Sequence, residues 1–224
     1  MTTMYSIYSK KKRSLFSRFS VNTNLIIANV ILFIGFTIVL SLNQGFLDFI
    51  AIKPSNIVHA KYLWTFIISM FMHAGVFHLF ANMFSLFFVG SLIERLLGSK
   101  RYLYFYLVAG IFASLFFVVV SFFIQGVDFN SYAVGASGAI FGIVGLLMFL
   151  TPNLPVYVMF IPIPIKMKYA APGLLIVLWF ISKAGGVPIG NTAHLGGFVF
   201  GLLYGLYLTK KYKNKTKAIR KHFS

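Results

Sequence analysis

The chain has 224 residues, of which 59% are hydrophobic and only 10% are charged, and it contains no cysteine. A soluble domain carries about 25% charged residues, so this composition excludes an ordinary globular protein and favours a multi-pass membrane protein; disulfides, thiol catalysis and cysteine-ligated metals are also excluded. The net charge of +17 would suggest nucleic-acid binding in a soluble protein, but here the basic residues lie between apolar segments and in the tails, which favours a role in membrane orientation.

Apolar runs near 20 residues recur along the chain, after a basic segment that does not resemble a cleavable signal peptide. The predicted class is an all-α polytopic membrane protein: a basic tail (1–20), a membrane domain (21–209) and a second basic tail (210–224). Six spans are expected, of which the fourth is short and the fifth only just long enough, at about residues 22–41, 76–96, 102–124, 136–150, 169–183 and 191–209.

The long connection at about residues 42–75 contains Tyr62 and Trp64, whose side chains favour a membrane interface. One interpretation places this connection on or partly in the membrane surface. The other interpretation is an ordinary loop that covers the bundle.

The basic residues predict the direction of each span. Of the 20 lysines and arginines, 17 fall in the two tails and in the connections after spans 2 and 4, and three (Lys53, Lys61 and Lys183) fall on the other side. The positive-inside rule then places the protein in the cell membrane with both termini in the cytoplasm. The basic tails are also expected to contact anionic lipid.

In this topology spans 2, 4 and 6 run in the same direction, and each carries unusual polar residues near its outer start. His78, Ser137 and His194 each lie roughly 20 Å from the inner end of their span, at a rise of ~1.5 Å per residue. A hydrocarbon core of ~30 Å places all three about 10 Å below the outer face. Asn82 shares a helix face with His78, and His73 is expected at the entrance of the same span. Polar groups at this depth are costly unless they are paired or hydrated, so they usually mark function.

These residue types allow acyl transfer. Serine needs a base to accept its proton, and a neutral histidine can do this, which predicts Ser137 as nucleophile and His194 as general base. The oxyanion of the tetrahedral intermediate needs hydrogen-bond donors, which the Asn82 amide, the His78 ring and the backbone N–H groups of Ser137 and Gly138 could supply.

Only three acids are present, and none is expected at the depth of the polar cluster. Glu94 lies at the inner end of span 2, and Asp48 and Asp128 lie in outer connections, so a Ser–His dyad is favoured over a triad, with Asp128 the one acid that could reach the histidine. A paired-aspartate protease is excluded, and the absence of an H-E-x-x-H motif argues against a zinc protease. No metal or cofactor is expected.

Each feature alone also has a structural explanation. A lone Gly-x-Ser-Gly is more often a packing motif, and a lone histidine or asparagine in a membrane is more often a structural hydrogen bonder. Small residues four apart let helices approach closely, which predicts that spans 4 and 6 are neighbours. The glycines concerned are Gly138, Gly142 and Gly145 in span 4 and Gly197, Gly201 and Gly205 in span 6.

Taken together, the motifs resemble the rhomboid family of intramembrane serine proteases. The resemblance covers nearly the whole chain apart from the tails. The matching segments, in family order, are His73-Ala74-Gly75-Val76-Phe77-His78-Leu79-Phe80-Ala81-Asn82-Met83, Glu94-Arg95-Leu96-Leu97-Gly98, Gly135-Ala136-Ser137-Gly138-Ala139, and Ala193-His194-Leu195-Gly196-Gly197 with Gly201.

The resemblance implies a rhomboid-like six-span fold that cleaves single-pass membrane proteins within or beside their transmembrane segment. Substrates would enter beside span 5, under a cap formed by the loop before span 6. By resemblance the roles are the nucleophile Ser137, the general base His194, the oxyanion-stabilising His78 and Asn82, a structural His73, and a polar motif of Glu94 and Arg95.

Two positions depart from the family pattern. Trp64 is followed by Thr65 where many members have arginine, and Phe141 stands where many bacterial members have a tyrosine beside the histidine ring. Two other functions stay open: a non-catalytic relative that binds membrane clients, and a small transporter that uses polar residues within its helices. Polar residues gathered at one depth fit a cavity open on one side better than a through path.

Overall fold

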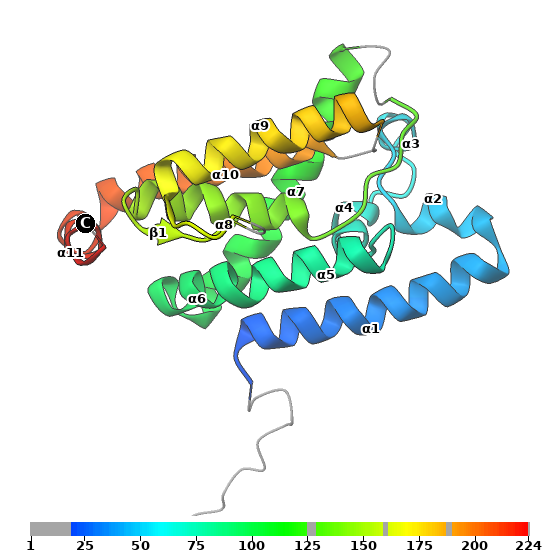
Figure 1. Ribbon diagram of the computed structural model, residues 1–224. Coiled ribbons are helices and arrows are strands. Elements are labelled where there is room, and N and C mark those ends of the chain that lie inside the picture. Colours follow the sequence, from blue (N-terminus) through cyan, green and yellow to red (C-terminus); the bar gives the residue numbers. More distant parts are fainter. Residues whose placement is uncertain (1–18, 125–128, 159–160, 187–189, 224) are drawn as a thin grey trace, which may run out of the picture.

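The computed structural model describes residues 19–124, 129–158, 161–186 and 190–223, which are mostly helical (Figure 1). Within these ranges, five apolar stretches are long enough to cross a membrane and a sixth apolar helix is shorter, as expected from the sequence. They correspond to α1 (Val21–Leu42), α5 (Val76–Ser85) continued by the π-helical turn η4 (Leu86–Gly90) and by α6 (Ser91–Leu97), α7 (Ser99–Phe123), α8 (Ser137–Leu150), α9 (Met167–Gly185) and α10 (Asn191–Lys211). The shorter helix is α8.

The connections carry short elements of their own. The segment between α1 and α5 folds into η2 (Gln44–Phe46), α2 (Leu47–Ile50), α3 (Pro54–Val58), α4 (Thr65–Ile68) and η3 (Ser69–Phe71). Between α8 and α9, strands β1 (Pro155–Val156) and β2 (Ile165–Lys166) pair antiparallel. The residues expected to form the second basic tail include a further helix, α11 (Lys213–His222).

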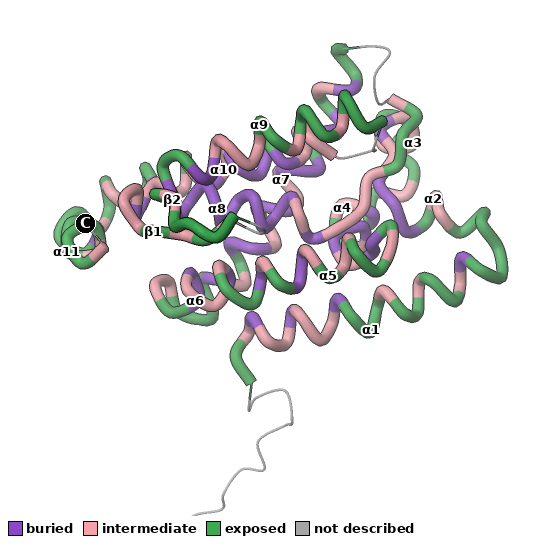
Figure 2. The backbone as a smooth tube through the Cα atoms, viewed as in Figure 1, coloured by how far each residue is buried: buried purple, intermediate pink, exposed green. Residues whose placement is uncertain are grey.

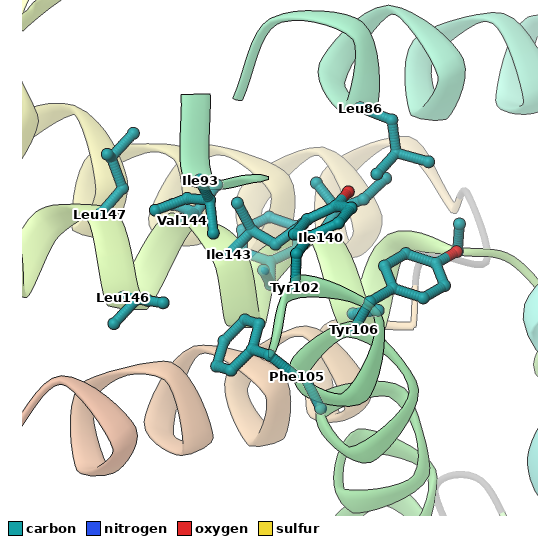
Figure 3. Packing of buried hydrophobic residues seen from close by; sticks show 14 of the residues in the cluster. Leu86, Ile93, Tyr102, Phe105, Tyr106, Ile140, Ile143, Val144, Leu146 and Leu147 are labelled. Atoms are coloured by element: carbon teal, nitrogen blue, oxygen red, sulfur yellow. The ribbon is translucent and has the colours of Figure 1, made fainter. Parts of the chain in front are cut away.

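Helix α8 lies at the centre of the bundle, and nearly all of its residues are buried (Figure 2). Figure 3 shows Ile140 and Ile143 of α8 near Tyr102 of α7, and Val144 and Leu147 further along α8 near Ile93 of α6. These residues belong to one core cluster that also includes side chains from α1, η4, α9 and α10. A helix that is apolar on every side is stable only when it is surrounded, so the composition of α8 explains its central place.

Glycines let α10 approach α8 until their backbones touch. A Cβ atom added to Gly197 would meet the Gly138 carbonyl oxygen, and one added to Gly201 would meet the Gly142 carbonyl oxygen. Gly145 likewise lies against the backbone of Phe198. The predicted close contact between the fourth and sixth spans is therefore confirmed.

The two ends of the bundle differ in charge. One end, here called the basic end, is where α6, α8 and α10 finish and α7 and α9 begin (Figure 1). It carries the basic residues Arg95, Lys100, Arg101, Lys166, Lys168, Lys210 and Lys211. Lys53 and Lys61 flank α3 and Lys183 is in the last turn of α9, and both α3 and the end of α9 lie at the opposite end (Figure 1). The basic residues of positions 10–18 fall outside the described ranges. This partition agrees with the grouping expected from the sequence.

Glu94 joins three helices at the basic end. Its two carboxylate oxygens accept hydrogen bonds from the backbone N–H groups of Val21 and Asn22, each at 2.9 Å, and Oε1 also accepts one from the Ser99 hydroxyl at 2.6 Å. The first N–H groups of a helix have no partner within the helix, and a carboxylate there also interacts favourably with the helix dipole. Glu94 therefore caps α1 and ties it to α6 and α7.

Asn22 extends this network into the core. Its amide donates to the Leu86 carbonyl at 2.7 Å and to the Ser91 hydroxyl at 3.0 Å, while its own Oδ1 accepts from the Tyr102 hydroxyl at 2.6 Å. Gly90 leaves room for these groups, since a Cβ there would lie 2.7 Å from the Tyr102 oxygen. Every polar atom of the Asn22 side chain is thus satisfied beside the π-helical turn.

We expect Asn22→Ala to destabilise the protein by on the order of 3 kcal/mol, because it leaves the buried Tyr102 hydroxyl without its acceptor and removes the hydrogen bonds to the Leu86 carbonyl and the Ser91 hydroxyl. Tyr102→Phe should cost less, since it removes the hydroxyl together with its need for an acceptor. The measurement is the thermal unfolding midpoint in detergent micelles. Asn214→Ala, on the exposed side of α11, is the matched control. Equal thermal midpoints for Asn22→Ala and the control would contradict the proposed contribution of this hydrogen-bond network to stability.

Candidate active site

Ser137 and His194 meet at the contact between α8 and α10. The Ser137 Oγ and His194 Nε2 atoms are 2.8 Å apart, which is hydrogen-bonding distance. Ser137 is the first residue of α8 and is partly accessible, whereas His194 is in the first turn of α10 and is buried. The contacts of Gly197 and Gly201 with α8 lie about one and two turns beyond His194 on α10. Close backbone packing is therefore what brings the two side chains together.

Phe141 holds the imidazole ring from one side. Its ring stacks on that of His194, with centroids 4.4 Å apart and an angle of 22° between the planes. Phe141 is one turn after Ser137 on the same face of α8. The position that departs from the family pattern therefore keeps its contact with the histidine, through a ring that has no hydroxyl.

His78 approaches the same region from α5. Gly135, two residues before Ser137, has φ +116°, and a Cβ there would lie 2.8 Å from the His78 Cε1 atom. Only glycine adopts this backbone conformation readily, and only glycine leaves space for the ring. The backbone N–H of Ala74 donates to His78 Nδ1 at 3.3 Å, so Nε2 carries the proton of the neutral ring.

His73 and Asn82 lie beside His78. The His73 ring is buried and contacts the His78 ring edge-on, with centroids 5.1 Å apart. The Asn82 side chain is also buried, and its amide donates to the His78 carbonyl at 2.8 Å. One N–H of this amide is thus engaged within α5, and the second remains for another acceptor. Gly138, the residue after Ser137, packs against Ala113 of α7.

The connection between α1 and α5 holds the segment that leads into α8. Ile52 and Ala133 exchange two backbone hydrogen bonds, and the Gly135 N–H donates to the Ser69 carbonyl at 2.8 Å. Thr65, the other position that departs from the family pattern, is buried, and its hydroxyl donates to the Tyr62 carbonyl. The connection therefore fixes the backbone immediately before Ser137.

The acids of the chain are engaged elsewhere or fall outside the described ranges. Asp48 accepts hydrogen bonds from Tyr132 and Asn56, and the Tyr132 hydroxyl is the main cause that lowers the pKa of this carboxyl. Glu94 caps α1, and both Glu94 and the exposed Arg95 belong to α6, which lies at the opposite end of the bundle from the start of α8 (Figure 1). Asp128 is not among the described residues. The buried Nδ1 atom of His194 has no hydrogen-bond partner within the described part of the chain.

Some positions that shape the candidate active site or the basic end carry no signal in the sequence. The Ala74 contact uses a backbone N–H group, which any residue except proline would provide. Gly135 belongs to the quoted Gly135–Ala139 motif, but the sequence predicted no role for it. Only its residue type hinted at its positive φ. Asn22 and Tyr102 looked like ordinary ends of spans. By contrast, the sequence predicted site roles for Ser137, His194, His78 and His73, and the fold brings these four residues into one region.

Comparison with known proteins identifies the family. The Rhomboid domain family matches residues 60–211. RHOMBOID-like protein 1 of Arabidopsis thaliana is 37% identical over 158 residues, which cover 69% of this chain and 37% of that protein. RHOMBOID-like protein 7 of the same plant is 33% identical over 161 residues, covering 70% of this chain and 47% of the relative.

Two further relatives bear on activity. Rhomboid protease GluP of Bacillus subtilis is 31% identical over 154 residues, covering 66% of this chain and 27% of that protein. Inactive RHOMBOID-like protein 8 of Arabidopsis thaliana is 32% identical over 140 residues, covering 61% of this chain and 36% of the relative. The chain spans less than half the length of these curated relatives. The matched domain and the helical membrane bundle together show that this chain is a multi-pass membrane protein of the rhomboid family.

Proposed function

We propose that the protein is an intramembrane serine endopeptidase that cleaves single-pass transmembrane proteins near the outer membrane face. The observation that carries this proposal is the 2.8 Å contact between Ser137 Oγ and His194 Nε2 inside an apolar bundle. A hydroxyl and an imidazole in this geometry form a nucleophile and its base. The proposal also agrees with the likeness to Rhomboid protease GluP.

The reaction has two halves. In the first, Ser137 Oγ attacks the carbonyl carbon of the substrate peptide bond and its proton moves to His194 Nε2. His194 then gives this proton to the departing amide nitrogen, the C–N bond breaks, and an ester joins the substrate to Ser137. In the second, His194 takes a proton from water, the hydroxide attacks the ester, and Ser137 recovers its proton as the new carboxyl end leaves. The Phe141 ring stacks on the His194 imidazole and holds its orientation during these proton transfers.

Donors for the oxyanion lie around the start of α8. Since Ala74 occupies His78 Nδ1, the proton on Nε2 is available to donate. The second N–H of Asn82 and the backbone N–H groups of Ser137 and Gly138, at the unpaired start of a helix, complete the set. We assign oxyanion stabilisation to His78, Asn82 and Gly138, and structural roles near the site to His73, Gly197 and Gly201.

The distribution of charge supports a cell-membrane location with the basic end in the cytoplasm. Ser137 then lies near the outer face, because α8 finishes at the basic end and its 14 residues span only about 21 Å of a core of ~30 Å. The substrates are proposed to be transmembrane proteins with one span.

The test is cleavage of a single-pass reporter protein by the purified chain in liposomes, combined with covalent labelling by a fluorophosphonate. This probe forms a bond only with an activated serine oxygen. We expect both reporter fragments, and we expect the label on the peptide that contains Ser137. A chain that is folded yet gives neither fragments nor label would overturn the proposal.

One alternative has support from a specific relative. Inactive RHOMBOID-like protein 8 shares the family with this chain, so a client-binding protein without activity is the second candidate. Photo-crosslinking of the reporter to α9 and α10, with no cleavage across a broad panel of substrates, would favour that candidate. Ser137 and His194 are both present and their side chains are in contact, which favours the protease over this alternative.

A further inference from the structure

Helix α11 continues from α10 almost without a linker. Helix α10 ends at Lys211 and α11 begins at Lys213, with Tyr212 between them. In Figure 1 α11 is seen end-on while α10 runs across the picture, so α11 lies crosswise to the spanning helix that precedes it. A helix joined in this way to the end of a membrane span must lie at the level of the lipid headgroups.

One face of α11 is fixed to the bundle. Thr216 is buried, and Ile219 is partly buried on the same face. The Arg220 guanidinium donates to the Phe149 carbonyl at 3.1 Å and lies over the Phe149 ring. The carbonyl groups of the last turn of a helix lack partners within the helix, so Arg220 caps α8. Helix α11 is therefore held in a set orientation against the basic end.

The flank of α11 next to the docked face is exposed and carries lysines. Figure 2 shows most of α11 as exposed. At about 100° per residue, Lys213, Lys217 and Lys221 fall within roughly 80° of arc on one side of the helix. No acidic residue follows Asp128 in the sequence, so α10 and α11 carry basic side chains and no acidic ones. Lys210 and Lys211 extend the same positive charge to the end of α10.

We propose that the Lys213, Lys217 and Lys221 flank of α11 binds the headgroups of anionic phospholipids in the membrane that holds the bundle. Charge complementarity selects this occupant, because a fixed row of ammonium groups at headgroup level meets phosphate groups of opposite charge. Tyr207 and Tyr212 beside Lys211 add the aromatic side chains that favour the interface. The proposal is independent of proteolytic activity.

The chain has no cysteine, so Asn214→Cys provides a single attachment point for a fluorophore on α11. The labelled full chain is reconstituted in phosphatidylcholine vesicles that contain equal mole fractions of either brominated phosphatidylglycerol or brominated phosphatidylcholine, whose bromines quench nearby fluorophores. We expect quenching by the anionic lipid to be stronger by about twofold or more. Equal quenching by the two lipids would overturn the proposal.

Matched variants separate a local site from net charge. Lys213→Gln/Lys217→Gln/Lys221→Gln should remove the preference, while Lys53→Gln/Lys61→Gln/Lys183→Gln, which loses the same three charges away from α11, should keep it. If both triple variants lost the preference for anionic lipid equally, the preference would depend on overall charge, and the proposed binding site on α11 would be overturned. Amide hydrogen exchange of residues 213–222 checks that α11 stays docked in the variant.

Two measurements need no change to the lysines. Ionic strength of about 1 M, where the screening length is ~3 Å, should abolish the lipid preference of the labelled Asn214→Cys chain. Inorganic phosphate added at constant ionic strength should leave it unchanged. If phosphate displaced the lipid, a soluble anion and not the membrane would be the ligand of this helix.

Discussion

Ser137→Ala and His194→Ala are each expected to lower the rate of reporter cleavage by at least about 10³-fold, without loss of the folded state. Removing Oγ removes the atom that forms the ester, and removing the imidazole leaves the hydroxyl without an acceptor for its proton. Because the two side chains act as one unit, the double variant should be no slower than either single variant. The measurement is the initial rate of fragment release in liposomes.

The chain offers matched controls for both changes. Ser41 is an exposed serine at the end of α1, and His59 is an exposed histidine of the connection between α1 and α5. Ser41→Ala and His59→Ala should cleave the reporter at the parental rate. Cleavage at the parental rate by both Ser137→Ala and His194→Ala would contradict a catalytic role for this dyad, whatever the controls show.

Gly201→Ala is expected to lower the stability of the bundle by about 1–3 kcal/mol and the cleavage rate by about 10²-fold. A Cβ at this position would press on the Gly142 carbonyl oxygen and lie 2.7 Å from the Leu146 nitrogen. Both are backbone atoms within a central helix, so they cannot turn away as a side chain would. The helices must separate, and a shift near 1 Å would take Ser137 Oγ and His194 Nε2 beyond hydrogen-bonding distance.

Gly35→Ala is the control for this change, since no atom lies within 4 Å of a Cβ at that position of α1. It should leave the rate unchanged and leave stability equal or slightly higher, because alanine favours a helix more than glycine does. The thermal midpoint and the cleavage rate are measured on the same preparations. A Gly201→Ala protein as stable and active as Gly35→Ala would contradict the close packing of α8 and α10.

The sequence was sufficient to predict the spans and the pairing of the polar residues. Apolar length located each helix within a few residues: α8 was expected near 136–150 and runs from Ser137 to Leu150. The basic residues gave each helix a direction, and counting residues from the inner ends put Ser137 and His194 at one depth. Glycine spacing then made their helices neighbours. These signals work because a membrane restricts helices to nearly parallel packing over a known thickness.

What the sequence did not predict depends on contacts between backbone groups. The pairing of Ile52 with Ala133, and of Gly135 with Ser69, uses N–H and carbonyl groups that every residue type shares, so no residue pattern announces it. The docking of α11 likewise depends on a carbonyl of Phe149. Composition alone made residues 210–224 a tail, since charge density does not reveal that one face of a basic helix is packed.

The π-helical turn at Leu86–Gly90 has a consequence for how the second span can change in length. Such a turn corresponds to one residue inserted into an α-helix, which rotates everything beyond it by about 100°. His78 must face Gly135 on one side of the turn, and Glu94 must face the start of α1 on the other. The inserted residue lets one continuous span meet both demands. Deleting any single residue between 86 and 90 would straighten the helix and turn one of these two side chains away from its partner. The exposed positions Phe87 and Phe88 therefore tolerate substitution more readily than this span tolerates a change of length.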